Sequence, residues 1–374
     1  VNIDGVVNTL RSMNGDVGGN LILVSPNGVV VGASGVLNVG SLSVITPTQT
    51  EYDVFADKIK NAPVYGQTVT VQDGDSTHTM TGYFGAGDTD LTVPTFTIDS
   101  AQTVDVAGRI AANGNINVQT GTFATQDGSI IAAGVNNSGK GINAVGADAL
   151  FNSLVKTGNT SNIDVTTNKG VNIVNGSIVQ NLGNGNTTIT NTGADGVLVA
   201  GTLTNSNGNL TINNTGANGI GISGTVTNSN GILEAINSGK SGINISGTVE
   251  NTGTTNITNQ AGGTDGIKLT STGKINNHGS SLNITNDATG GIDLRGVITG
   301  DNKALVNVTS NNSNVTIGDV ANEHNIIADN TVTVNVTNGD FLNNGVTTNH
   351  IVTSDGADLV INATNGAIGE ELVC

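Results

Sequence analysis

Short stretches in which apolar and polar residues alternate recur along the middle of the chain. Leu210–Ile212 and Ile220–Ile222 are two examples, each with a small or polar residue between two aliphatic ones. Alternation with a period of two turns one set of side chains inward and the other outward on a β-strand. Asn-Gly, Thr-Gly and Ser-Gly pairs separate the stretches and indicate tight turns. The pattern therefore predicts short strands joined by turns.

The alternating stretches belong to a repeated unit of 23 residues. Three copies follow one another without a gap, at Asn184–Ser206, Asn207–Ser229 and Asn230–Thr252. A repeat of this length indicates a solenoid, in which each unit buries its apolar face against the next. Apolar residues recur at three slots, to which we assign Ile189, Ile212 and Ile236, then Val197, Ile220 and Ile243, then Leu203, Val226 and Val249.

Three strands in each unit predict an all-β fold, a right-handed parallel β-helix with about 23 residues per coil. Roughly 14 coils would stack at the strand spacing of about 4.8 Å. Further units are expected at Asn113–Val135, Ser138–Thr160, Ser161–Gly183 and Ser280–Asn302.

Asn recurs at an equivalent turn of each unit, as Asn191, Asn214 and Asn237. Stacked Asn side chains can form a ladder of amide hydrogen bonds. Turn propensity alone would also place Asn at these positions, so both explanations stay open. A Gly followed by an aliphatic residue marks the second strand of each unit, for example at Gly219–Ile220 and Gly242–Ile243.

Residues 49–100 interrupt the repeat and hold six of the nine aromatic residues. Aromatic side chains bury a large area each, so this stretch is expected to form an extra-helical β insertion with a small core of its own. We expect a hairpin or small sheet packed on the flank of the rod, which would explain why Leu21–Val24 and Val29–Val31 are apolar at successive positions. The insertion also offers candidate ligand contacts, namely Tyr52, Phe55, Tyr65, Tyr83 and Phe84.

The charge balance restricts the class of partner. The chain carries a net charge of −17 and has a pI of about 4.2, although only 11% of its residues are charged. A nucleic-acid partner requires a basic stripe, and an anionic membrane surface requires a polybasic segment. We therefore expect neither a nucleic-acid partner nor a membrane surface. We also expect the chain to be a monomer that binds no cofactor and no metal.

Catalysis of the kind found on other β-helices needs convergent carboxylates, or an Arg or Lys base beside them. The exposed slots of the repeat hold Asn, Thr and Ser instead, so the chain is expected not to be an enzyme. A β-helical carbohydrate-active enzyme is the less favoured alternative. Asp293 and Arg295 are expected to form a surface ion pair. The four His residues have no metal-ligand spacing and are expected on the surface: His78, His278, His324 and His350.

The first fifty residues carry a motif in three parts, at Ser25–Val29, Val31–Gly32 and Val39–Leu42. The combination resembles the secretion domain of two-partner-secretion exoproteins of the filamentous-haemagglutinin type, also known as the haemagglutination activity domain. In that family an Asn-Pro-Asn-Gly motif is followed by Val-x-Gly and by Val-Gly-Gly-Leu or Val-Gly-Ser-Leu. Ser25 stands where the family usually has Asn. The secretion motif of this chain consists of Ser25, Pro26, Asn27, Gly28 and Val29.

The resemblance implies a bacterial protein that is secreted or held at the cell surface after export across the outer membrane. The partner it implies is an outer-membrane two-partner-secretion transporter of the Omp85 type, which recognises the secretion domain. Residues 1–110 would be the secretion domain with its insertion at 49–100, and residues 111–374 the β-helical shaft of an adhesin for an unidentified host-cell or matrix ligand. The stalk of a contact-dependent toxin-delivery exoprotein is the alternative.

Overall fold

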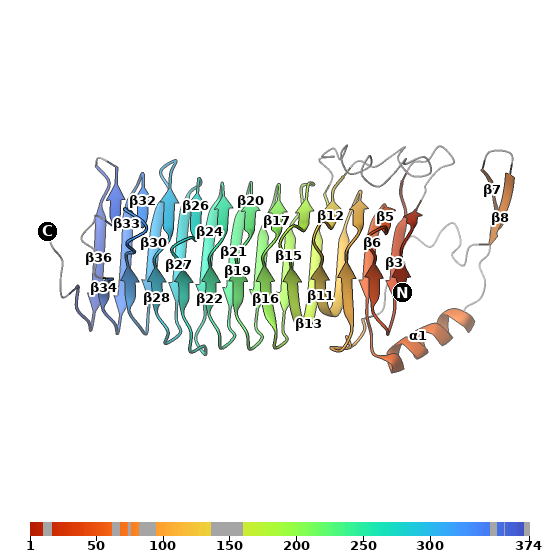
Figure 1. The fold of residues 1–374 in the computed structure, drawn as a ribbon, viewed down its shortest axis with the longest axis horizontal. Coiled ribbons are helices and arrows are strands. Elements are labelled where there is room, and N and C mark those ends of the chain that lie inside the picture. Colours follow the sequence, from red (N-terminus) through yellow and green to blue (C-terminus); the bar gives the residue numbers. More distant parts are fainter. Residues whose placement is uncertain are drawn as a thin grey trace.

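The computed structural model describes residues 1–9, 17–61, 68–73, 76–81, 95–135, 160–344, 350–354 and 356–369. Within them the chain winds into a stack of parallel β-strands, and Figure 1 shows the coils following one another from the N-terminal to the C-terminal end. The parallel β-solenoid predicted from the repeat is confirmed, with about 12 coils spaced roughly 24 residues apart.

The strands stand in three columns that run the length of the stack. Two columns belong to one 22-stranded sheet, because β11 (Ile116–Thr125) and β13 (Ile163–Ile173) run through both. The first column consists of β3 (Asn20–Val24), β6 (Ser41–Ile45), the first parts of β11 and β13, β15 (Thr187–Asn191), β18 (Leu210–Asn214), β21 (Ile232–Asn237), β24 (Thr254–Asn259), β27 (Ser281–Asn286), β30 (Leu305–Ser310), β33 (Val332–Thr337) and β36 (Leu359–Thr364). The second column consists of β1 (Asn2–Ile3), β4 (Val29–Val31), β9 (Thr103–Val106), the last parts of β11 and β13, β16 (Gly196–Val199), β19 (Ile220–Ile222), β22 (Ile243–Ile245), β25 (Ile267–Leu269), β28 (Ile292–Leu294), β31 (Val315–Ile317) and β34 (Phe341–Asn343).

The third column is a separate 12-stranded sheet whose neighbours also pair in parallel. Each coil therefore hydrogen-bonds to the coil before it and to the coil after it. The strands of this column are β2 (Val6–Asn8), β5 (Val36–Val39), β10 (Arg109–Ala112), β12 (Ile130–Ala133), β14 (Ile178–Asn181), β17 (Thr202–Asn205), β20 (Thr225–Asn228), β23 (Thr248–Asn251), β26 (Lys274–Asn277), β29 (Val297–Gly300), β32 (Ile326–Ala328) and β35 (Ile351–Thr353).

Strand pairing confirms two of the three predicted apolar slots and corrects the third. Leu203 pairs with Val226, and Val226 with Val249, one 23-residue unit apart. In the remaining slot Ile212 pairs with Ala235, whereas Ile236 lies opposite Asn213 on the outer face. Assigning Ile236 to the core was wrong, because the period-two alternation of β21 turns Ala235 inward and its neighbour outward.

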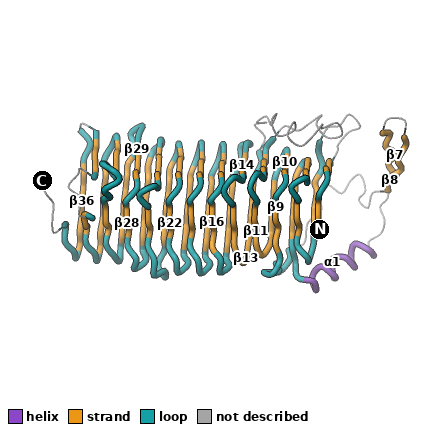
Figure 2. The backbone as a smooth tube through the Cα atoms, viewed as in Figure 1, coloured by secondary structure: helices purple, strands orange, loops and turns teal. Residues whose placement is uncertain are grey.

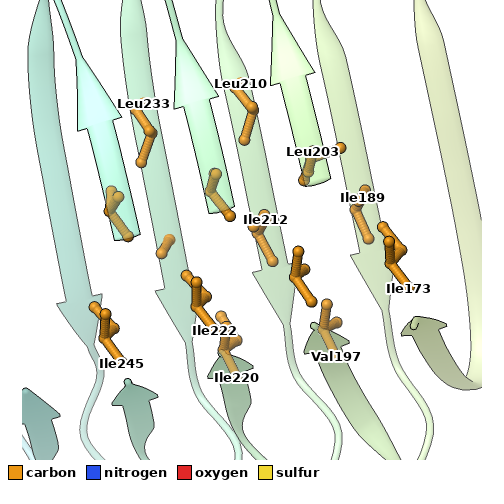
Figure 3. Packing of buried hydrophobic residues seen from close by; sticks show 14 of the residues in the cluster. Ile173, Ile189, Val197, Leu203, Leu210, Ile212, Ile220, Ile222, Leu233 and Ile245 are labelled. Carbon is orange, nitrogen blue, oxygen red and sulfur yellow. The ribbon is translucent and has the colours of Figure 1, made fainter. Parts of the chain in front are cut away.

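The core is a column of aliphatic side chains enclosed by the three strand columns. Figure 3 shows inward residues of successive coils, among them Leu203, Ile212 and Ile220, stacked in rows between the strands. Each of these three side chains is at most 1% exposed. Burial of one aliphatic side chain contributes about 1.5–3 kcal/mol, so the stack is stabilised by many similar rows and not by one central cluster.

Asn191, Asn214 and Asn237 form a ladder of buried amides. The Nδ2 of Asn191 donates to Oδ1 of Asn214 at 2.8 Å, and Asn214 donates in the same way to Asn237 at 2.8 Å. Two further steps of 2.8 Å extend the ladder to Asn259 and Asn286. All five side chains are fully buried, so protein partners replace water for their polar atoms. The ladder explanation for these residues is confirmed.

A second buried ladder, not predicted above, stands at the end of the third column. The Nδ2 of Asn205 donates to Oδ1 of Asn228 at 3.1 Å, and Asn228 donates to Asn251 at 3.1 Å. Asn251 then donates to Oγ1 of Thr255 at 3.1 Å, and that hydroxyl donates to Asn277 at 2.7 Å. In the sequence, the recurrence of Asn at the last position of β17, β20 and β23 indicates this second ladder.

One predicted unit does not add a coil. β11 pairs directly with β13, and β12 pairs directly with β14, so the coils that flank residues 136–159 stack on each other. The expectation of a coil at Ser138–Thr160 is therefore wrong, and residues 136–159 lie outside the described part of the chain. The missing coil and the slightly longer spacing of roughly 24 residues account for the 12 strands of the third column, where roughly 14 coils were expected.

The insertion begins with a helix, α1 (Gln49–Asn61), where only β structure was expected. Its sequence QTEYDVFADKIKN has no run of β-branched residues and places Glu51 in the first turn, where an acidic side chain interacts favourably with the helix dipole. β7 (Thr68–Asp73) and β8 (Ser76–Thr81) then form an antiparallel hairpin, as predicted. Figure 2 shows the helix and the hairpin outside the stack, at its N-terminal end.

The predicted packing of the hairpin on the flank is wrong, because Figure 1 places β7 and β8 beyond the end of the stack. Val30 of the apolar run Val29–Val31 is 41% exposed. A buried apolar cluster lies instead on the outer face of the third column. There Val36, Ala111 and Ala132 are buried in a second small cluster.

Candidate functional site

The Ser25–Val29 motif forms the turn between β3 and β4. The Oγ of Ser25 donates to the carbonyl of Gly28 at 2.8 Å and closes the turn. Gly28 has a φ of +78°, a conformation that glycine adopts without steric cost. A Cβ atom at this position would also lie 2.7 Å from the carbonyl oxygen of Thr103 in a neighbouring coil. Glycine is therefore required both by the turn and by the stacking of the next coil.

The turn presents a single side chain to solvent. Ser25, Pro26, Gly28 and Val29 are buried, whereas Asn27 is exposed. The backbone N–H of Ser25 donates to the Ile45 carbonyl of the next coil at 3.0 Å, which anchors the turn. The side-chain amide of Asn27 makes no hydrogen bond to any described residue, so its donors and acceptor are open to solvent or to a partner.

The other two parts of the motif lie on the elements that follow. Val31–Gly32 ends β4, and Val39–Leu42 forms the corner between β5 and β6. A Cβ atom on Gly40 would meet the backbone of Gly19, so this corner also needs glycine. The three parts thus occupy successive corners of the same coil, between β3 and β4, between β4 and β5, and between β5 and β6. Their role in export stays a prediction.

Two of the five aromatic candidates in the insertion are placed by the structure. Tyr52 and Phe55 are half-buried on α1. The ring of Phe55 packs edge-on against Phe96, with centroids 5.3 Å apart and planes at 85°. This contact holds the helix against the returning chain and is typical of a small core. The remaining three candidates lie outside the described residues: Tyr65, Tyr83 and Phe84.

A groove of about 590 Å³ lies on the outer face of the second column, across five consecutive coils. Its strands are β16, β19, β22, β25 and β28 in the middle of the rod (Figure 1). The middle residue of each strand points outward into it, and pairing places these residues side by side. The row reads Leu198, Gly221, Asn244, Lys268 and Asp293.

The groove carries charges of both signs. Asp195 and Asp265 are exposed on one rim, and Lys268 extends from the floor without an ion-pair partner among the described residues. At one end, Nε of Arg295 donates to Oδ2 of Asp293 at 2.9 Å. The surface ion pair predicted for these two residues is confirmed. Three carboxylates and one ammonium group line the groove, so its charge balance is negative, and one of the carboxylates is paired with Arg295.

One of the three histidines whose burial the structure describes differs from expectation, and the side chain of His78 lies outside the described part. His350 is only 8% exposed, and its Nδ1 lies 2.8 Å from Oδ1 of Asn325, so a surface position for it was wrong. Gly318 packs against its ring, and a side chain there would fill the same space. His278 is partly exposed, with Nδ1 2.8 Å from the Asp301 carboxylate. In the part of the chain that is described, no three metal-ligating side chains come together.

The sequence analysis did not predict the groove, although the outward position of the second strand in each unit indicates it. The middle residue of the second strand changes from unit to unit, as Leu198, Gly221 and Asn244, while its neighbours stay aliphatic. A variable outward position next to constant inward ones distinguishes a surface from a core. The glycine was instead interpreted only as part of the alternation.

Comparisons with protein-family models, with curated proteins and with solved structures find no match for this chain. The structure describes no helix with the length and apolar character of a membrane span. The features of the molecule that bear on its function are therefore the fold, the exposed turn at Asn27 and the groove on the second column.

Proposed function

We propose that the chain is a non-enzymatic part of an exported bacterial adhesin, with the secretion motif in its first coils and an adhesive shaft in the rest. The observation that carries the proposal is the exposed Asn27 amide on a turn fixed by Ser25 and Gly28. A rigid turn that presents one unpaired amide is suited to recognition by an outer-membrane transporter, because little ordering is needed on binding.

The stacked architecture supports export of an extended chain. Each coil contacts only its neighbours, so coils can form one after another as they emerge on the far side of a membrane. The buried Asn ladders support the same order of events, since each new coil finds an amide partner on the last one formed. Positions 1–110 remain our proposed secretion domain, and positions 111–374 the shaft.

Export assays of an Asn27 variant test the proposal. The chain is co-expressed with an outer-membrane transporter of the two-partner-secretion type, and its amounts in the medium and in the cells are compared. Asn27→Asp should reduce the secreted fraction and leave the cell-associated protein, because one amide donor group is replaced by a charged acceptor. Asn230→Asp provides the matched control, since Asn230 is another exposed turn residue but lies in the shaft.

The two variants together separate recognition from general effects. Unchanged export of Asn27→Asp would contradict the assigned role of the turn. An equal loss with Asn230→Asp would show that added negative charge alone impairs secretion. Adhesion is tested separately, by binding of the purified chain to cells.

A further inference from the structure

We propose that the groove across β16, β19, β22, β25 and β28 binds an extended, uncharged glycan whose long axis runs parallel to the stack. The proposal names a ligand class for the shaft and rests on the adhesive part of the proposed function, not on the export route. Five coils at about 4.8 Å each give the groove a length of roughly 20 Å, which suits a chain-like ligand and not a compact one.

The polar lining matches the hydrogen bonding of sugar hydroxyls. Ser241 and Thr264 contribute hydroxyl groups, and Asn244 contributes an amide that both donates and accepts. Carboxylates of Asp195 and Asp265 on the rim can accept from hydroxyl groups of the ligand. The hydroxyl groups of a glycan donate and accept hydrogen bonds along its whole length. They could therefore pair both with the hydroxyl and amide groups of the lining and with the carboxylates of the rim.

The floor offers the apolar contacts that sugar rings need on their C–H faces. Leu198 is 44% exposed at one end of the groove. Next to it Gly221 has no side chain, which leaves the strand surface open between two outward neighbours. The floor therefore offers an apolar contact at its Leu198 end and polar groups along the rest of the row, so the C–H face of a sugar ring would lie over Leu198 and Gly221.

Other ligand classes fit less well. The acidic lining disfavours a polyanion. A polycation would have only the two rim carboxylates to pair with, because Asp293 is paired with Arg295, and it would meet Lys268 on the floor. An extended peptide would have to add as a strand, but the backbones of β19 and β22 are already paired on both sides. Single-stranded nucleic acid would require aromatic stacking partners, and none lines the groove.

Calorimetric titration of the purified chain with uncharged hexasaccharides tests the inference. The probes are the β-1,4-linked glucose, β-1,4-linked mannose and α-1,6-linked glucose oligomers. At least one should bind, and Gly221→Phe should weaken its binding about tenfold or more by filling the floor. The variant is expected to fold, since a Cβ at Gly221 meets only the flexible end of Leu198, at 3.1 Å. Thr227→Phe, on the third column of the same coil, is the matched control and should bind like the wild type.

Each outcome decides the question. If no hexasaccharide binds, or if Gly221→Phe binds as tightly as the wild type with an unchanged circular dichroism spectrum, the inference is wrong. Tighter binding of polygalacturonate that weakens with added salt would also overturn it, because the ligand would then be anionic. The export assay of the Asn27 variants is independent of all these results.

Discussion

The side-chain amide of Asn214 donates to Oδ1 of Asn237 at 2.8 Å across the boundary between two coils. The same amide donates to the carbonyl of Gly216 at 3.2 Å within its own turn. Asn214 is fully buried, so these bonds form in a medium of low polarity. A slip of two residues between coils, which keeps the same side chains inward, would place Asn191 opposite Ile212 or Gly216 and leave its amide without an amide partner. The ladder therefore fixes the register.

Asn214→Ala should lower the free energy of unfolding by about 2–4 kcal/mol, because it leaves buried partners on Asn191 and Asn237 unsatisfied. Asn213→Ala, one residue earlier on the outer face, should change stability by about 0.5 kcal/mol or less. Urea unfolding followed by circular dichroism measures both. Equal effects at the two positions would show that the ladder adds nothing beyond turn propensity.

The corrected apolar slot gives a second matched pair. Ile212→Ala removes a fully buried side chain and should cost about 2–5 kcal/mol. Ile236→Ala removes an outward side chain and should cost about 1 kcal/mol or less, although both residues were assigned to the same slot from the sequence. Thermal and urea unfolding of the two variants provide the comparison. A larger loss for Ile236→Ala would contradict the observed register.

Much of the fold could be predicted from the sequence because each unit repeats the same local information. The register of Leu203, Val226 and Val249 follows directly from the 23-residue period. Ile236 was assigned to the core wrongly because Ala235 and Ile236 are adjacent apolar residues and either could fill the inward slot. Only the strand pairing shows that Ala235 fills it. The helix at Gln49–Asn61 was missed because it belongs to no repeat, so no second copy supported its identification.

The candidate sites were predictable to different degrees. The Ser25–Val29 turn was predictable because Pro26 and Gly28 favour the backbone conformations of a tight turn. The groove depends on residues such as Leu198 and Lys268 that are three units apart, and only the stacking of coils places them on one face. The 23-residue period predicts that such residues stack on one face, but it does not show that the face is hollowed into a groove.

Two glycines on the second column should respond differently to the same substitution. Gly242→Ala would press its Cβ against the backbone of Gly266 in the next coil and should cost about 3 kcal/mol or more. Gly221→Ala meets only a movable side chain and should stabilise the chain by about 0.5–1 kcal/mol, since alanine loses less backbone entropy on folding. Thermal unfolding distinguishes them. Similar losses for both would mean that adjacent coils are less closely packed than observed.

Asp164 on β13 should make a measurable contribution to the pH dependence of stability. Burial raises the pKa of its carboxyl group above 3.8, and a hydrogen bond with Thr188 partly opposes this. The folded state then holds the proton to higher pH than the unfolded state does, so stability falls as pH rises from about 3.8 through the folded pKa. Asp164→Asn should remove this loss. Urea unfolding from about pH 3 to about pH 7 should show the variant gaining on the wild type as pH rises. A constant difference across that range would contradict the prediction.

Removal of the insertion should leave the stack intact. The N–H of Thr48 donates to the carbonyl of Thr97 at 3.0 Å, so the two ends of the insertion lie side by side. A short Gly-Ser linker in place of residues 49–96 should close this gap, and the thermal midpoint should change by less than about 4 °C. Circular dichroism and thermal unfolding test this. Loss of the β signal would show that α1 or its contact with Phe96 is needed for the first coils to form.

The buried amide ladder also gives the rod a polarity. Every side-chain step from Asn191 to Asn286 donates toward the C-terminal end, and none donates in the opposite direction. The two ends of the ladder are therefore chemically different templates: one offers an acceptor and the other offers a donor. A growing stack that starts at the N-terminal end would always present the donor to the incoming coil. If the chain emerges with its N-terminal side first, each new coil would therefore accept the same hydrogen bond from the coil that formed before it.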